Sequence, residues 1–237
     1  VGFSGNFPEM SLRYQVYAFN GFNGYSDGAG NFRGKDAFRK GRQKGAESYM
    51  TSPNLSTKVD YYGIQGLKMG VSGYFGKSQS DMFKGLLKDD PEGNMNADSS
   101  RVDIAMLGFD ARYQNQGFTA RGMAVTSKNG NTAAYNGFTG NDLGSNLFGY
   151  YLEAGYDVLR LFKTRSRQQL NVFARYEEYD THNKVAGDLA RNLAYNRTDI
   201  TIGAGYLIAS GAVLKADYQL FKNAAVGESN KKQLNFG

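Results

Sequence analysis

Apolar and polar residues alternate along most of this chain. In residues 147–161, for example, Leu152 and Ala154 share one face, whereas Glu153 and Asp157 share the other. A period of two with one apolar face is the signature of a β-strand. Ten segments follow this pattern, and residues 1–7 form a partial further strand. The ten are residues 11–23, 55–62, 67–77, 101–113, 118–128, 147–161, 169–179, 197–209, 212–222 and 231–237.

The connections between these segments are alternately short and long. Short turns are expected at residues 63–66, 114–117, 163–167 and 210–211. Long polar loops are expected at residues 24–54 and 78–99, and two more end near residues 145 and 196. Strands of about 9–11 residues cross a bilayer at a tilt, and loops sorted by length are typical of bacterial outer-membrane proteins. We therefore predict one domain over residues 1–237, a transmembrane antiparallel up-and-down β-barrel with short periplasmic turns and long extracellular loops.

The strand over residues 101–113 departs from regular alternation. Its apolar residues change face between Met106 and Leu107. A β-bulge near residues 105–107 would restore the phase. A misplaced strand boundary would explain the change equally well.

Composition supports a sheet protein. The 237 residues include 31 Gly, 17 Tyr and 16 Phe but only 3 Pro, and Cys is absent. Few prolines suit a backbone whose donors must all be paired, and the lack of Cys excludes disulfides and Cys-based sites. A soluble antiparallel sheet with one wet face is the alternative fold. Apolar faces rich in Ala, Gly and Tyr, with charges at mid-strand on the opposite faces, favour lipid outside and water within.

Charged residues recur on the polar faces of successive strands, and we predict that they line the pore. The basic members are Arg13, Lys58, Lys68, Arg112, Arg121, Arg175 and Lys215, and the acidic members are Asp60, Asp110, Glu153, Asp157, Glu177, Asp199 and Asp217. Selectivity for phosphate needs an excess of Lys and Arg at a constriction. The two signs are balanced here, which favours cross-strand ion pairs that line and stiffen the wall.

The predicted loop over residues 24–54 is the longest, and it holds the densest basic cluster. Its cations are Arg33, Lys35, Arg39, Lys40, Arg42 and Lys44. Long loops can fold into a barrel, where this cluster would form a basic lip that attracts anions. A surface loop that touches lipopolysaccharide phosphates is the alternative. The net charge of +6 is spread along the chain, so no nucleic-acid partner is expected.

The predicted outer loops also hold a candidate metal site and the single histidine. One loop is rich in oxygen ligands for Ca²⁺, but it lacks EF-hand spacing and its residues are equally typical of turns. The candidates are Asp89, Asp90, Asn94, Asn96 and Asp98. His182 has no nucleophile motif near it and is predicted at the surface. We therefore expect no cofactor and no enzyme activity.

Three stretches carry a family likeness. They are residues 10–22, which begin Met-Ser-Leu-Arg-Tyr; residues 32–42, Phe-Arg-Gly-Lys-Asp-Ala-Phe-Arg-Lys-Gly-Arg; and residues 62–77, which begin Tyr-Gly-Ile-Gln-Gly. With the run from Leu170 onward, they resemble the family of phosphate-selective O/P-type porins in the form found in Bacteroidota-like bacteria. The resemblance implies about sixteen strands in a complete barrel, so we expect this chain to lack N-terminal strands and a short C-terminal tail. It also implies passive diffusion of small hydrophilic solutes or ions, including anions such as phosphate.

The resulting prediction is a Gram-negative outer-membrane porin, a water-filled diffusion channel. Its expected partners are outer-membrane lipid, lipopolysaccharide and small hydrophilic solutes, together with further copies in a homotrimer or other outer-membrane proteins. A narrow or plugged barrel that serves as a structural subunit of a larger outer-membrane complex is the alternative function.

Overall fold

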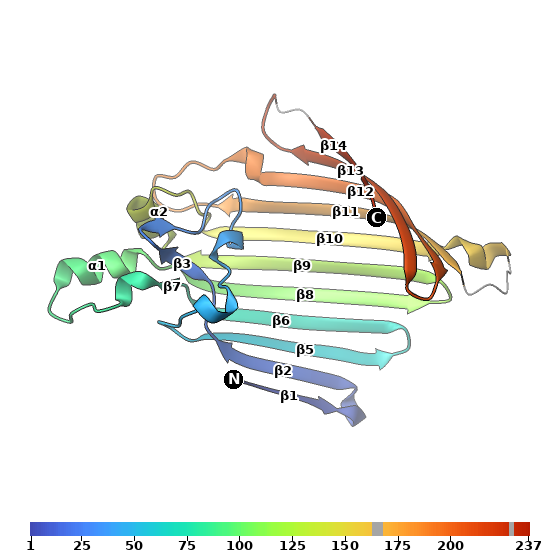
Figure 1. The fold of residues 1–237 in the computed structure, drawn as a ribbon, viewed down its shortest axis with the longest axis horizontal. Coiled ribbons are helices and arrows are strands. Elements are labelled where there is room, and N and C mark those ends of the chain that lie inside the picture. The colour runs from blue at the N-terminus through green and yellow to red at the C-terminus, as the bar shows by residue number, and fades with distance from the viewer. Residues whose placement is uncertain (163–167, 228–229) are drawn as a thin grey trace.

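One large antiparallel sheet dominates the computed structural model, which describes residues 1–162, 168–227 and 230–237. Eleven strands follow the order β1, β2, β5, β6, β8, β9, β10, β11, β12, β13 and β14 (Figure 1). Their bounds are Gly2–Phe7, Leu12–Phe19, Asn54–Ile64, Leu67–Lys77, Asp103–Asn115, Phe118–Gly130, Asn146–Asp157, Gln169–Lys184, Asn196–Ala209, Ala212–Asn223 and Lys231–Phe236. Each of the ten neighbouring pairs is antiparallel. The predicted all-β, up-and-down order is therefore confirmed, and residues 1–7 form a strand as expected.

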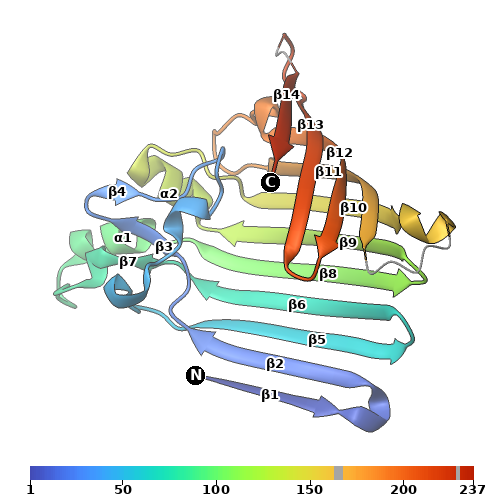
Figure 2. The same cartoon turned by 45° about the vertical axis from the view of Figure 1, so that its right-hand side comes forward.

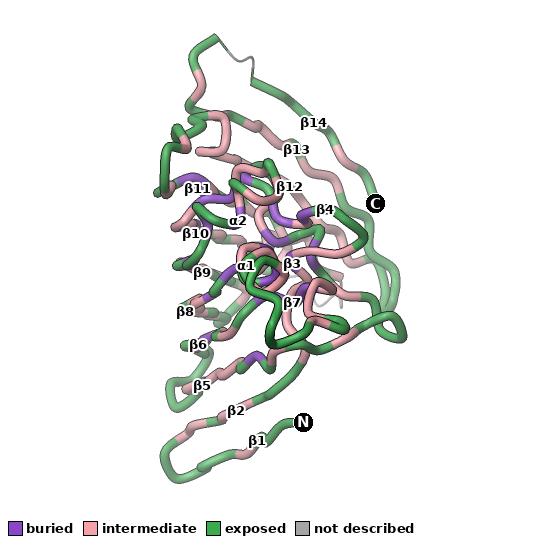
Figure 3. Tube along the Cα trace, turned by 90° about the vertical axis from the view of Figure 1, so that its left-hand side faces the viewer, coloured by how far each residue is buried: buried purple, intermediate pink, exposed green. Residues whose placement is uncertain are grey.

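The sheet is curved but open. Figure 3 looks along the strands from the loop end and shows them following an arc, and Figure 2 shows β13 and β14 turned away from the plane of β5 to β10. β1 and β14 are the two ends of the strand order and have one neighbour each in the described chain. The described residues thus form a curved wall, and the closure predicted from the sequence is not present in them.

Most short connections lie at one end of the sheet and the long ones at the other, as predicted (Figure 1), but the connection between β10 and β11 at the short-turn end spans residues 158–168, as many as the connection after β11. Two residues join β5 to β6, β8 to β9 and β12 to β13 at what we call the turn end. The long connections after β2, β6, β9 and β11 lie at the loop end. The turn predicted at residues 163–167 lies outside the described residues.

The long connections are folded rather than extended. β3 (Asn23–Ser26), β4 (Ala29–Gly30) and β7 (Gln79–Ser80) form a second, three-stranded sheet. The helix α1 (Pro91–Ser99) follows β7, and α2 (Thr132–Thr139) follows β9. The 3-10 turns η1 to η6 span Pro8–Met10, Arg39–Gly41, Gly45–Glu47, Asp81–Phe83, Val158–Phe162 and Leu193–Tyr195. Among the described residues, no helix is long and apolar enough to cross a membrane.

Three strand ends differ from the predicted ones by four residues or more. β2 ends at Phe19 because the chain then leaves the large sheet for β3. β10 ends at Asp157, where the Asp157 carboxylate accepts hydrogen bonds from the backbone N–H groups of Leu159 (3.3 Å) and Leu170 (3.0 Å) and fixes the turn. β11 continues to Lys184, because its last residues pack against the long connections.

The two faces of the sheet have different surroundings. The long connections fold against the concave face (Figure 3). Large apolar residues stand on the opposite, convex face and are exposed in the described chain: Leu107, Leu152 and Ile202 have exposed fractions of 55%, 63% and 61%. The folded connections therefore cover the polar, concave face and leave the apolar, convex face exposed.

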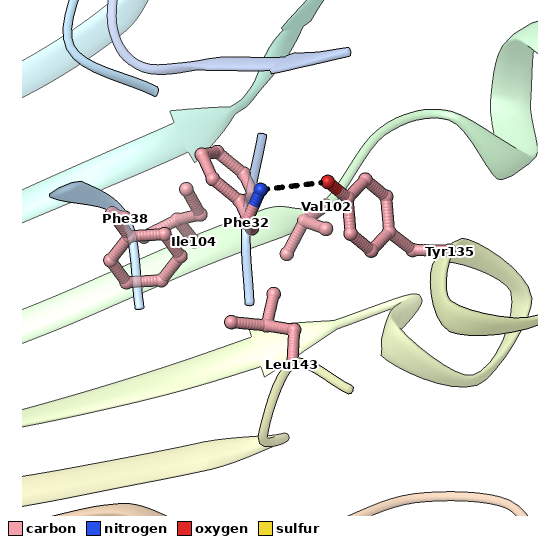
Figure 4. Packing of buried hydrophobic residues seen from close by; sticks show 6 residues of the cluster. All are labelled: Phe32, Phe38, Val102, Ile104, Tyr135 and Leu143. Carbon is pink, nitrogen blue, oxygen red and sulfur yellow. Dashed lines mark hydrogen bonds between the residues drawn. The ribbon is translucent and has the colours of Figure 1, made fainter. Parts of the chain in front are cut away.

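Buried apolar residues gather at the loop end of the concave face (Figure 4). The cluster consists of Phe32, Phe38, Val102, Ile104, Tyr135 and Leu143. This cluster explains why the apolar residues of β8 change face between Met106 and Leu107. Ile104 points inward to the cluster, whereas Leu107 points outward. β8 pairs with β6 and β9 in continuous register, so the predicted bulge is absent. A shifted boundary is not the cause either, because the inward apolar residues lie where the folded connection covers the wall.

Replacing Phe32 by Ala should release the connection between β2 and β5 while the large sheet stays folded. Loss of a fully buried phenyl ring costs about 3–5 kcal/mol. We expect trypsin to cleave between Arg33 and Lys44 much faster in Phe32→Ala than in the parent protein. Met50→Ala, in the same connection but 59% exposed, is the control. Equal protection in both variants would contradict this account of the packing.

Candidate pore interior

The strand register places all fourteen charged residues predicted to line the pore on the concave face. Arg13 of β2 lies opposite Asp60 of β5. Glu153 of β10 lies opposite Arg121 of β9 on one side and Arg175 of β11 on the other. The remaining members occupy positions of the same parity in their strands. The concave face is therefore polar and charged along the whole sheet.

A first group of ion pairs joins β5, β6 and β8. The Lys58 Nζ lies 2.7 Å from the Asp110 Oδ2 and 3.4 Å from the Asp60 Oδ1. The Lys68 Nζ lies 3.2 Å from the Asp60 Oδ2. Asp60 is almost fully buried beneath these two lysines. This group crosslinks three strands on the concave face.

A second group joins β9, β10 and β11. The Arg121 guanidinium lies 2.7 Å from the Glu153 carboxylate, and the Arg175 guanidinium lies 2.9 Å from the Glu177 carboxylate. Arg175 also stacks over the ring of Tyr151, 4.1 Å from its centroid. The Arg121–Glu153 pair and the Arg175–Tyr151 stack cross between strands, as expected for contacts that stiffen a wall, whereas Arg175 and Glu177 belong to the same strand, β11.

Among the remaining charged residues of the concave face, the cations are exposed and unpaired within the described chain, whereas the acids accept hydrogen bonds. Three cations are exposed and form no ion pair with a described residue, namely Arg13, Arg112 and Lys215. The remaining acids are held by uncharged donors. Asp199 accepts from the Tyr179 hydroxyl at 3.3 Å, Asp217 accepts from the Asn235 amide at 2.7 Å, and Asp157 accepts from backbone N–H groups. The accessible surplus on the concave face is therefore positive, although the counts are equal.

Like charges also stand side by side across the strands. Lys68 lies opposite Arg112, which lies opposite Arg121. Directly opposed like charges are destabilising unless water or a counter-ion screens them. In this row the carboxylates of Asp60 and Glu153 neutralise Lys68 and Arg121, and Arg112 between them is exposed.

The connection between β2 and β5 folds across the concave face at the loop end (Figure 3). Its buried members Phe32, Gly34, Phe38 and Gly41 face the wall. Its six cations are all exposed, namely Arg33, Lys35, Arg39, Lys40, Arg42 and Lys44. The alternation of buried and basic residues holds the backbone against the wall and directs the charges away from it. The backbone of this connection thus folds against the concave face, and the basic lip that attracts anions stays a prediction.

Tyr135 of α2 is the central anchor of this connection (Figure 4). Its hydroxyl accepts a hydrogen bond from the Phe32 N–H at 3.0 Å and donates one to the Gly24 carbonyl at 2.7 Å. Burial raises the pKa of Tyr135, so its hydroxyl stays protonated and able to donate.

A second anchor lies at Gly34. The Gly34 N–H donates to the Asp142 carboxylate at 2.8 Å, and the Thr181 hydroxyl donates to the Gly34 carbonyl at 2.5 Å. A Cβ at this position would collide with His182, Tyr195 and the Asp142 carbonyl. Glycine is needed here because of this close approach.

The structure overturns the predicted surface position of His182. The side chain is 1% exposed and packs edge-on against Tyr195 with ring centroids 4.7 Å apart. Its Nδ1 accepts from the Asn192 N–H at 3.2 Å, so its Nε2 carries the proton and donates to the Asp142 carbonyl. Neither nitrogen faces a serine. His182 supports the Gly34 anchor. The sequence did not predict this buried position because the expected strand ended at residue 179, before His182.

The predicted metal candidates serve to build α1. The Asp90 carboxylate caps the helix by accepting from the Gly93 N–H at 2.9 Å, and the Asn94 amide donates to the Asp90 carbonyl at 2.6 Å. Asp98 pairs with Arg101 at 2.5 Å. Asp89 and Asn96 belong to the same segment. Among the described residues, no group of three or more His, Asp or Glu side chains is arranged to hold a metal ion.

Comparison with known proteins gives one distant likeness and no family. No family model matches the chain. An uncharacterized protein of Aquifex aeolicus (strain VF5) is 27% identical over 207 residues, which cover 87% of this chain and 45% of that protein. The chain thus spans less than half the length of this relative. The resemblance to O/P-type porins stays a prediction.

Tyr135→Phe should loosen the folded connection without disturbing the large sheet. It removes one hydroxyl and leaves the buried Phe32 N–H unpaired, at about 1–3 kcal/mol for a buried group without a partner, whereas the Gly24 carbonyl keeps the hydrogen bond that the Asn31 N–H donates at 2.8 Å. We expect faster hydrogen exchange at the Phe32 amide. Tyr25→Phe is the control, because the Tyr25 hydroxyl forms no hydrogen bond with the described residues. Unchanged exchange in Tyr135→Phe would contradict the anchoring role.

Proposed function

We propose that this chain forms a large part of the wall of an outer-membrane β-barrel that acts as a porin for small hydrophilic solutes. The observation that carries the proposal is an uncharged, apolar belt on the convex face. In the described strands, charged residues of outward parity lie in the half of each strand nearer the loop end. The exposed or partly buried ones are Lys77, Asp103, Lys128, Glu178, Lys184, Lys222 and Lys232, and Asp180 of the same parity is buried.

The belt itself consists of large apolar residues separated by Ala and Gly. Val71, Phe109 and Leu214 are 57%, 50% and 60% exposed, and similar residues recur on each strand. A soluble protein would cover so large an apolar surface with a second layer. The described connections instead fold on the opposite face. Hydrocarbon is the solvent that suits such a belt.

Closure of the barrel follows from the same reasoning. The edges of β1 and β14 would leave unpaired backbone groups in lipid. With eleven antiparallel strands, these two run in the same direction, so antiparallel closure needs an odd number of further strands. Such strands belong, in this proposal, to the full-length protein, and the greater length of the Aquifex aeolicus relative supports this.

The charged concave face then lines an aqueous pore. Arg13, Arg112 and Lys215 supply unpaired positive charge on the wall, and the folded connection adds its six exposed cations at the loop end. A basic lip raises the local concentration of anions. We therefore propose a pore that favours small anions, of which phosphate is one.

The folded connection also supports the second candidate function, a plugged barrel that serves as a structural subunit. Its buried cluster around Phe32 and Tyr135 fills the loop end of the concave face with apolar side chains. A barrel blocked in this way would not conduct. Recording from single proteins in a planar bilayer distinguishes the two candidates, because only the porin gives stable open conductance.

A charge on the belt should prevent membrane insertion. Leu152→Arg places a guanidinium on the convex face in the middle of β10, which costs about 2–4 kcal/mol at the bilayer midplane. Met123→Arg is the control, since Met123 is also large and apolar but faces the concave side opposite Asp110. We expect the folded fraction in lipid vesicles to fall for Leu152→Arg alone. Equal folding of both variants would argue against lipid contact at the belt.

The basic lip should set ion selectivity. The double variant Arg39→Gln with Arg42→Gln removes two positive charges from the lip. It should lower the ratio of anion to cation permeability by about twofold or more. Lys222→Gln with Lys232→Gln removes the same charge from the convex face and should leave the ratio unchanged. The reversal potential across a salt gradient measures both. A shift of equal size in the two variants would refute the role of the lip.

A further inference from the structure

The loop end of the convex face holds a basic hollow that the pore does not use. It lies over β6, β8, β9, β10 and β11 and has a volume of about 850 Å³. Its charged residues are Lys77, Asp103, Lys128 and Lys184, and its apolar lining includes Phe75, Ala105 and Leu107. Three lysines from three different strands therefore line this hollow together with apolar residues.

The charge of this hollow is not neutralised within the described protein. Lys77 lies 3.5 Å from Asp103, and both side chains are about half exposed. Lys128 and Lys184 are exposed and form no ion pair with a described residue. A site with three ammonium groups and one carboxylate carries a surplus of two positive charges, which complements a phosphate group.

The apolar part of the hollow runs down from the charged rim into the belt. Lys77 and Phe75 are two residues apart in β6, about 7 Å along the strand, and Leu107 lies four residues from Asp103 in β8, about 13 Å. Ala105, between Asp103 and Leu107, keeps the floor low. This shape fits a molecule with a phosphorylated head and an acyl chain, rather than a free anion.

We propose that this hollow binds a phosphorylated glycolipid of the outer leaflet, lipopolysaccharide, through its lipid A phosphate and one acyl chain. The inference rests on the proposed outer-membrane function, in which the loop end faces the cell exterior. The lysines lie where the headgroups of that leaflet begin, directly above the uncharged belt. This site is separate from the basic lip, which lies on the concave face.

The test is native mass spectrometry of the full-length protein, released from detergent micelles after titration with diphosphoryl lipid A. Lys128→Gln with Lys184→Gln should weaken lipid A binding by about thirtyfold, as two lysine–anion contacts of about 1 kcal/mol each imply. Lys222→Gln with Lys232→Gln removes the same charge from the same face outside the hollow and should bind like the parent. Equal loss in both double variants would overturn the proposal.

Two further arms identify the ligand. Ala105→Trp fills the floor while keeping every lysine, so it should weaken binding of lipid A but not of inorganic phosphate. If inorganic phosphate competes with lipid A at equal molar concentration, the site binds free phosphate and the glycolipid assignment is wrong.

Conductance of the parent protein is recorded from the same preparation. Protein that neither inserts nor conducts would remove the porin proposal, whereas conducting protein with no lysine-dependent lipid A binding would remove only this inference.

Discussion

The alternation of side chains across a hydrogen-bonded antiparallel sheet is the constraint on which the rest of this structure depends. Each strand satisfies its backbone groups through its neighbours, and each side chain is thereby assigned to one of two faces. Because the ten strand pairs keep nearly continuous register, one parity carries charge from β2 to β13 and the other carries apolar residues. A slip of one residue would exchange the faces and would place charges in the apolar belt.

The loop end of the wall shows how a polar face can acquire a local core. Val102 and Ile104 have the parity of the charged residues, yet they are buried because the connection after β2 crosses over them. Apolar packing alone does not position this connection. Tyr135, Asp142 and Thr181 bind its backbone groups, and the missing Cβ of Gly34 permits the close approach. Hydrogen bonds fix the path, and burial of Phe32 adds apolar stabilisation.

Charge is arranged differently on the two faces, and this difference links the fold to the proposed function. On the concave face, charges occur along the full length of the strands, partly paired and partly free. On the convex face, they are confined to the half of each described strand nearer the loop end. Such a distribution corresponds to water throughout one side and to a boundary between hydrocarbon and headgroups on the other. The basic hollow around Lys128 lies at that boundary, whereas the basic lip around Arg39 lies within the proposed pore.

The sequence alone determined the strand order, the sorting of turns and loops and the face of every charged residue predicted on the wall. These properties are local, because a period of two and a turn between strands can be read from neighbouring residues. Contacts between distant segments were not readable in this way. The meeting of Phe32 with Ile104 and Tyr135, the burial of His182 beneath Gly34 and the convergence of Lys77, Lys128 and Lys184 join residues that lie far apart in the chain. The phase change at Met106 and Leu107 was a visible sign of the first contact, but only the folded connection showed that it marks a covered patch rather than a bulge. Tertiary structure decided these sites because long connections choose their path through packing and hydrogen bonds that no local pattern encodes.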